Sequence, residues 1–262
     1  MSAAAVEVLQ TAEPEAKALA SRRAASAWRD GAIATIGQAA PPVRPARPAR
    51  PELRRPGDMP RRRLGGTRGR IAMLHAVAHI ELNAIDLAWD LIARCAPIAL
   101  PRAFFDDWVG VADDEARHYL ALADRLAALG AGYGDLPAHD GLWEAAEQTA
   151  HDPLARLAVV PLVLEARGLD VTPAMIERLE RVGDGDSAKV LQMIYREEIG
   201  HVAAGMRWFR HLCDGDPRPP EEIWRTLVAR HFTGQLKPPF NAKARNLAGF
   251  PAEFYDPGGF SH

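Results

Sequence analysis

Cysteine is scarce in this 262-residue chain, and so is any long apolar run. The 2 cysteines, Cys95 and Cys213, are far apart and lack Cys-x-x-Cys spacing. This pattern excludes a disulfide scaffold and a cysteine-built zinc site, and it favours a reducing compartment.

A membrane span needs about 18 uninterrupted apolar residues. The most apolar stretch, residues 71–93, is interrupted by five polar side chains: His75, His79, Glu81, Asp86 and Asp90. The first residues show neither the basic start nor the apolar core of a secretory signal. We therefore expect a cytoplasmic protein without a membrane partner.

Strand patterns and the common nucleotide and hydrolase motifs are also missing. No stretch alternates β-branched and polar residues for long enough to predict a strand. The chain has no Gly-rich phosphate loop, no Ser/His/Asp nucleophile pattern and no His-Glu-x-x-His motif. With 48% hydrophobic and 25% charged residues, it has the composition of a folded globular protein. We predict an all-α fold.

Proline and glycine divide the second part of the chain into helices. The predicted helices cover residues 69–95, 101–129, 141–150, 153–167, 173–182, 186–213 and 219–232. Gly168 is expected to end one helix, and Thr172 and Pro173 to begin the next as N-cap and first residue. Two weaker Ala-rich helices are predicted over residues 3–20 and 21–37. Three of these helices, 69–95, 101–129 and 186–213, exceed about 25 residues, which is typical of a four-helix bundle.

The segment that precedes these helices is rich in arginine and proline. Ten arginines lie between Arg44 and Arg70 against two acidic residues, and seven prolines lie between Pro41 and Pro60. Such a segment predicts an extended linker or arm. The expected organisation is a helical extension (1–40), the arm (41–68), a di-metal four-helix bundle (69–214), and a C-terminal helix and tail that pack on the bundle (215–262).

Glutamates on apolar helix faces are the main functional signal. Each of the four main predicted helices (69–95, 101–129, 153–167 and 186–213) has a glutamate with apolar residues at helical spacing around it, and two of these glutamates have a histidine three residues later. A buried unpaired charge is costly, so such residues need a partner. The candidate metal ligands are Glu81, Glu115, His118, Glu165, Glu198 and His201.

The spacing of these residues has a chemical purpose. Residues i and i+3 share a helix face about 5–6 Å apart, so a Glu-x-x-His pair can bind one ion. Four carboxylates in a core need about four positive charges, which two divalent metals supply. Oxygen-rich ligation with one nitrogen per metal suits iron or manganese. The order Glu, Glu-x-x-His, Glu, Glu-x-x-His matches the template of ferritin-like di-iron bundles.

Two motifs and three longer runs carry a resemblance to known proteins. Residues 114–118 (Asp-Glu-Ala-Arg-His) have the Asp-Glu-x-Arg-His form of di-iron carboxylate oxygenases, and residues 197–201 (Glu-Glu-Ile-Gly-His) are a looser copy. Residues 75–86, 133–143 and 164–173 resemble a bacterial family of uncharacterised ferritin-like proteins. The resemblance covers about residues 55–255 and implies a ferritin-like fold and a metal site, without an established substrate.

The template also assigns roles to the ligands. It has Glu115 and Glu198 bridging the metals, His118 and His201 each holding one, and Glu81 and Glu165 as terminal ligands. Glu197 is an alternative to Glu198. The second motif departs from the oxygenase pattern at Gly200, where that pattern has arginine, so one supporting ion pair is in doubt.

The expected protein is a di-iron oxidoreductase that uses O2 to oxidise or hydroxylate an organic substrate, with an electron donor as a further partner. Two iron ions are the expected cofactor; a Mn/Fe or manganese pair accepts the same ligands. The alternatives are a tRNA-modifying hydroxylase that uses the arm, a ferroxidase or metal buffer without organic substrate, and a metal-free scaffold. A homodimer is compatible with the sequence.

Several residues near these ligands have two interpretations. His75, His79 and Asp86 lie on another face of their helix than Glu81, and inter-helix packing is favoured for them over a second metal site. Asp114 is either a support for a metal ligand or a solvated charge. Tyr119 and Tyr195 lie one turn from expected ligands and are favoured as packing residues.

Overall fold

The computed structural model describes residues 1–55, 58–59, 66–256 and 258. These residues fold as helices and connections without a strand, which confirms the all-α prediction. They cluster into two compact units, Met1–Trp143 and Glu144–His262. The predicted domain boundaries stay predictions.

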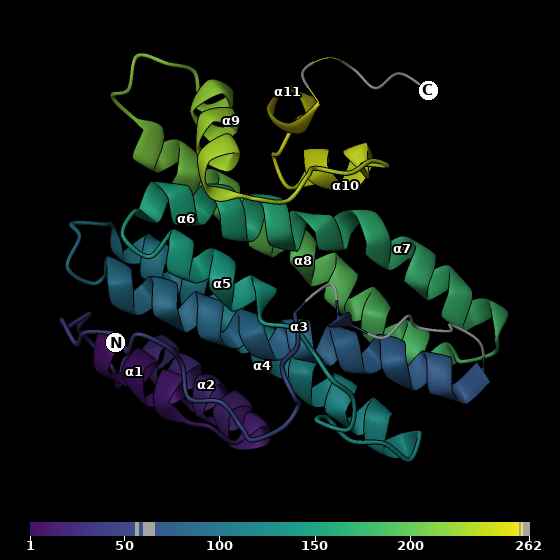
Figure 1. Ribbon diagram of the computed structural model, residues 1–262. Coiled ribbons are helices and arrows are strands. Elements are labelled where there is room, and N and C mark those ends of the chain that lie inside the picture. The colour runs from purple at the N-terminus through teal and green to yellow at the C-terminus, as the bar shows by residue number, and fades with distance from the viewer. Residues whose placement is uncertain (56–57, 60–65, 257, 259–262) are drawn as a thin grey trace. The chain divides into compact units, whose positions relative to one another are not determined.

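The first unit is built on a pair of long helices, α3 (Gly66–Cys95) and α4 (Arg102–Ala128) (Figure 1). Pro97 and Pro101 lie in the short connection, and Pro101, in extended conformation, is the N-cap of α4. A connection of this length makes neighbouring helices antiparallel. Residues at equal distances from the turn therefore lie side by side: Glu81 is 14 residues before Cys95, and Glu115 is 13 residues after Arg102.

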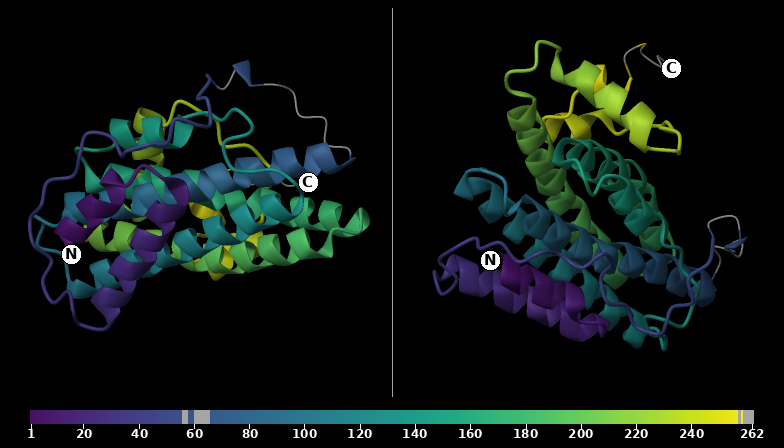
Figure 2. Two further views of the ribbon diagram at one scale, coloured as in Figure 1. Left: turned by 90° about the horizontal axis from the view of Figure 1, so that it is seen from below. Right: turned by 60° about the vertical axis from the view of Figure 1, so that its left-hand side comes forward.

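Two N-terminal helices cover this pair. The helix α1 (Ser2–Gln10) packs on α3, and α2 (Pro14–Arg29) packs on α4 (Figure 2). The predicted break between residues 20 and 21 is wrong. The break falls at residues 11–13, because Pro14 takes the first position of α2, where a missing N–H costs nothing. Ser21 is buried in the middle of α2 and donates to the Ala112 carbonyl of α4 (2.8 Å).

The described part of the arginine- and proline-rich segment packs on the first unit. Arg44 pairs with Asp140, and Arg47 lies 3.2 Å from Asp86 of α3. A parallel bridge joins Leu53 to Ala138. These arginines therefore have acidic partners that are remote in sequence. Residues 61–63, the densest arginine run of the predicted arm, lie outside the described residues.

The second unit contains one helical rod made of three segments. These are α6 (Pro153–Val159), the π-helical η2 (Val160–Glu165) and α7 (Ala166–Arg181). Pro161 has no N–H and its ring displaces the carbonyl four residues earlier, so the helix widens into a π turn. Glu165 is the last residue of that turn. The predicted helix end at Gly168 and new start at Pro173 are wrong, because α7 runs through both residues.

The helix α8 (Gly185–Cys213) packs along all three segments of this rod. The contact with η2 is close at Gly205, where an added Cβ would lie 2.6 Å from the Cβ of Pro161. The turn between α7 and α8 has three residues, so these two helices are antiparallel and form a second hairpin.

The C-terminal part of the second unit folds back on this hairpin. It consists of α9 (Pro220–His231), α10 (Ala242–Leu247) and α11 (Ala252–Tyr255). The Trp224 indole of α9 donates to the Ala158 carbonyl (3.0 Å), and Arg245 of α10 forms a buried ion pair with Asp170 of α7 (2.7 Å). A short helix, α5 (Gly141–Gln148), spans the boundary between the units.

One described helix, α3, is long and apolar enough to cross a membrane, judged by its length and composition alone. The mean hydropathy of its most apolar window is 1.3, and 78% of that window is buried inside the protein. Burial of this extent is typical of the core helix of a folded domain.

Candidate metal centre

The first hairpin brings three of the predicted ligands together. Glu81 of α3 and Glu115 and His118 of α4 have ligand atoms that all lie within 4.8 Å of one another. The His118 Nδ1 atom is 3.2 Å from Glu81 Oε2 and 3.3 Å from Glu115 Oε2. All three side chains are buried, with at most 4% of each exposed. The matched distances of Glu81 and Glu115 from the turn are the reason these carboxylates face each other.

Burial makes this arrangement electrostatically demanding. It raises the pKa of Glu81 well above its ordinary value, and the neighbouring Glu115 carboxylate raises that pKa further. A hydrogen bond from His118 acts in the opposite direction. Without a cation, these effects favour the protonated form of Glu81, and a divalent cation would favour its ionised form.

The second hairpin repeats the pattern with three further predicted ligands. On α8, His201 Nδ1 is 3.5 Å from Glu198 Oε1, and both side chains are buried. Glu165 is half-buried at the end of η2. It precedes the end of α7 by 16 residues, and Glu198 follows the start of α8 by 13, so both lie at a similar height above the turn. Within each unit, one helix of the hairpin thus carries a lone glutamate at a height similar to that of the Glu-x-x-His pair on the other helix.

The donor set fits a hard or borderline divalent metal. Each hairpin offers two carboxylates and one imidazole, with no thiolate among them. Iron and manganese accept such ligands, whereas structural zinc sites are built mainly from cysteine and histidine. The buried cluster of Glu81, Glu115 and His118 could therefore hold a metal ion.

The structure separates the alternatives that the sequence leaves open for nearby acidic residues. Asp114 pairs with Arg117 one turn along α4 (2.5 Å), and about a third of each side chain is exposed. This arrangement is that of a helix-surface ion pair. Glu198 is buried whereas Glu197 is half-buried, so the side chain in the Glu-x-x-His spacing is the one that faces the interior.

The two tyrosines next to expected ligands differ in their surroundings. Tyr119 is buried and makes an edge-to-face contact with Tyr133 (5.5 Å between ring centroids). Burial raises the pKa of Tyr119, so its phenol stays protonated. Tyr195 is half-buried and accepts a hydrogen bond from Asn241 (2.9 Å).

The histidines on the other face of α3 anchor a loop, as the packing interpretation predicts. His75 Nε2 accepts a hydrogen bond from the Gly134 N–H (3.0 Å). His79 Nδ1 lies 2.8 Å from the Tyr133 hydroxyl, and its Nε2 lies 2.9 Å from the His139 carbonyl oxygen. Since a carbonyl only accepts, Nε2 carries the proton and Nδ1 accepts from Tyr133.

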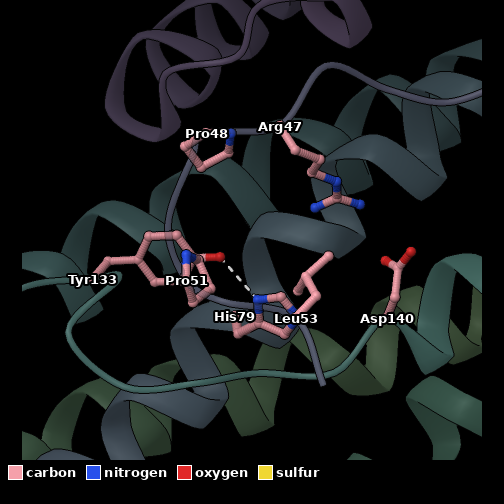
Figure 3. Close-up of a pocket in the computed structure, with 7 residues that line it drawn as sticks. All are labelled: Arg47, Pro48, Pro51, Leu53, His79, Tyr133 and Asp140. Carbon is pink, nitrogen blue, oxygen red and sulfur yellow. Dashed lines mark hydrogen bonds between the residues drawn. The ribbon is translucent and has the colours of Figure 1, made fainter. Parts of the chain in front are cut away.

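His79 also lines a small depression of about 240 Å³ of empty space, part of it open to solvent. Figure 3 shows Tyr133 and His79 hydrogen-bonded on one side, with Arg47 and Asp140 farther along. Burial lowers the pKa of His79 to about 4, so the ring is neutral at pH 7. No second metal cluster is found among the described residues.

Sequence reasoning missed the charges that support α3 from the N-terminal helices. Lys17 of α2 is fully buried and pairs with Asp86, which itself lies one to two turns from Glu81. Sequence spacing gives no signal for such a pair, because its members are 69 residues apart. The π turn that ends at Glu165 had one signal in the sequence, the proline at position 161.

Comparison with known proteins gives a family and no activity. The family model described as "Protein of unknown function (DUF455)" matches residues 10–256. An uncharacterised protein of Haemophilus influenzae is 40% identical over 205 residues, which are 76% of this chain and 71% of the relative. No solved structure gives a significant match.

Proposed function

We propose that this chain, which belongs to the DUF455 family of proteins of unknown function, is a ferritin-like di-iron protein that oxidises or hydroxylates an organic substrate with O2. One observation carries the proposal. Each of the two helical hairpins has a lone glutamate on its first arm and a Glu-x-x-His pair on its second, at similar heights above the turn.

From the order of the candidate ligands along the sequence, we infer a four-helix bundle in which these residues hold one pair of metals. The ligands would be the six residues named from the sequence: Glu81, Glu115, His118, Glu165, Glu198 and His201. Four carboxylates balance the charge of two divalent ions. A bound iron pair supplies reversible one-electron chemistry and an open position for O2.

The residues around the first hairpin's ligands support such chemistry. Glu81, Glu115 and His118 are themselves buried away from bulk water. Charge interactions among their ligand atoms are therefore stronger than at the surface. The buried Tyr119, whose pKa is raised, cannot act as a base at neutral pH. The reaction requires a small-molecule substrate, O2 and an electron donor as partners.

The described part of the arm does not favour the tRNA-hydroxylase alternative. Among the described arginines of the proposed arm, Arg44, Arg47 and Arg54 are engaged in ion pairs with acidic residues of the same chain. A nucleic-acid arm requires cations available to phosphates. The ferroxidase alternative uses the same metals, and it is separated from the proposal by experiment.

The test begins with metal-free protein loaded anaerobically with Fe(II) and exposed to a pulse of O2. We expect about two iron ions per chain, an absorbance transient and limited O2 uptake that an organic substrate increases. Replacing two ligands together, Glu115→Ala with His201→Ala, removes metal and transient. The matched control, Glu222→Ala with His211→Ala, changes exposed residues of the same types and retains both.

Two results would contradict the proposal. Repeated oxidation of added Fe(II) that no organic compound alters identifies a ferroxidase. Iron binding that survives the two ligand substitutions shows that the buried carboxylates are structural.

A further inference from the structure

A single side chain near the end of the protein contacts both helices of the second hairpin. Asn241 is the N-cap of α10. Its Nδ2 atom donates to the Leu169 carbonyl of α7 (3.1 Å) and to the Tyr195 hydroxyl of α8 (2.9 Å). This amide therefore links two antiparallel helices through hydrogen bonds that belong to neither helix.

The acceptor on α7 exists because of a proline inside that helix. In an α-helix, the carbonyl of Leu169 accepts a hydrogen bond from the N–H four residues later. That residue is Pro173, which has no N–H. The Asn241 amide supplies the donor that Pro173 lacks, and this replacement explains how α7 continues through a proline.

The position and orientation of Asn241 are fixed by two further hydrogen bonds and by an ion pair that holds one of its partners. Its backbone N–H donates to Asp170 Oδ1 (2.8 Å), and its Oδ1 accepts from the Ala244 N–H (3.1 Å). The same Asp170 carboxylate, fully buried, pairs with Arg245 (2.7 Å). Because Oδ1 is used as an acceptor, Nδ2 must face Leu169 and Tyr195.

Both partners of the amide lie one helical turn from an expected metal ligand. Leu169 follows Glu165 by four residues, and Tyr195 precedes Glu198 by three, so each partner shares a helix face with its glutamate. We propose that Asn241 is a positioning residue that sets the spacing of α7 and α8 so that the carboxylates of Glu165 and Glu198 bind metal. This inference rests on the proposed function.

The first test is Asn241→Asp in the full-length protein, titrated anaerobically with Co(II), whose visible absorption reports ligand geometry. The carboxylate retains the size of the side chain and the cap on α10, and it removes the two donated hydrogen bonds. We expect Co(II) to bind about 10–100-fold more weakly, with an altered absorption spectrum. Asn246→Asp makes the same exchange at an exposed position of α10 and leaves both unchanged.

Two more variants keep the inference testable if Asn241→Asp folds poorly. Tyr195→Phe removes only the hydroxyl acceptor, and it should weaken Co(II) binding in the same direction. Pro173→Ala, added to Asn241→Asp, returns a backbone donor to the Leu169 carbonyl. It does not restore the hydrogen bond that the Asn241 amide donates to the Tyr195 hydroxyl. We expect this double variant to regain thermal stability and to keep its weak Co(II) binding.

The outcomes separate this inference from the proposed function. A parent protein that binds no Co(II) overturns the proposed function and the positioning role together. A parent protein that binds Co(II), with Asn241→Asp binding equally well, overturns the positioning role alone. Recovery of Co(II) affinity by Pro173→Ala also overturns that role, because it shows that Asn241 only satisfies a carbonyl.

Discussion

Lowering the pH is expected to destabilise the protein through His79. In the folded chain, burial holds the pKa of this imidazole at about 4, against an ordinary value of 6.5. Between these two values the unfolded chain binds a proton that the folded chain does not bind. Stability is therefore retained above pH 6.5 and is lost as the pH falls toward 4, by about 2 kcal/mol between pH 7 and pH 5.

The structure shows why protonation is unfavourable at this site. The His79 ring accepts from Tyr133 at Nδ1 and donates to the His139 carbonyl at Nε2. A second ring proton would remove the acceptor, in a place that water reaches poorly, with the Arg47 cation also opposing the charge. The neutral ring is the form that holds the loop onto α3.

The assay is urea unfolding of the metal-free protein at pH 7 and pH 5, for the parent and for His79→Gln. Glutamine does not titrate and retains a donor near the His139 carbonyl, so its loss of stability over this pH range should be about 2 kcal/mol smaller. His211→Gln, at an exposed site, is the control and should follow the parent. An NMR titration that places the His79 pKa near 6.5, or equal pH dependence in all three proteins, would refute the reasoning.

Two further predictions concern packing and buried charge. Gly205→Ala should lower the free energy of unfolding by about 1–3 kcal/mol, because its Cβ would lie 2.6 Å from the Cβ of Pro161. Gly200→Ala, which has open space around it, should raise the free energy of unfolding by about 0.5–1 kcal/mol. Equal effects of these two substitutions in urea unfolding would contradict the close contact of α8 with η2. Asp86→Asn should cost about 3–5 kcal/mol because it leaves the Lys17 ammonium buried without its carboxylate. Lys17→Met combined with Asp86→Leu should recover part of that loss, since Arg47 loses its ion pair with Asp86 and keeps its hydrogen bond to Asn83. Differential scanning calorimetry measures the stability of the single and the double variant. A loss of stability well below about 3 kcal/mol for Asp86→Asn alone would show that Lys17 is neutral in the folded protein.

Much of the fold was predictable from local pattern. Apolar residues at helical spacing, bounded by proline and glycine, predicted the long helices, and the apolar neighbours of Glu81 and Glu115 predicted that these carboxylates face inward. The i+3 histidine at position 118 completed a cluster that the first hairpin brings together. These features depend on short sequence distances, which is why they could be predicted.

The features that the sequence did not predict depend on contacts between remote parts of the chain. Local propensity predicts that α7 stops before Pro173, and the helix continues because Asn241, 68 residues later, replaces the missing donor. Arginines of the 41–55 segment seemed to lack acidic partners, yet Arg47 reaches Asp86. The sequence contains both members of each pair and no local signal that joins them.

The central claim is that the six candidate ligands hold one pair of metals, and the electron paramagnetic resonance spectrum of Mn(II)-loaded protein tests it most directly. At two manganese ions per chain, the account predicts the spectrum of an exchange-coupled pair, which either Glu81→Ala or Glu165→Ala abolishes. Two uncoupled six-line Mn(II) signals, each lost only when its own hairpin is altered, would contradict it. That result would show two separate sites in place of a di-metal centre.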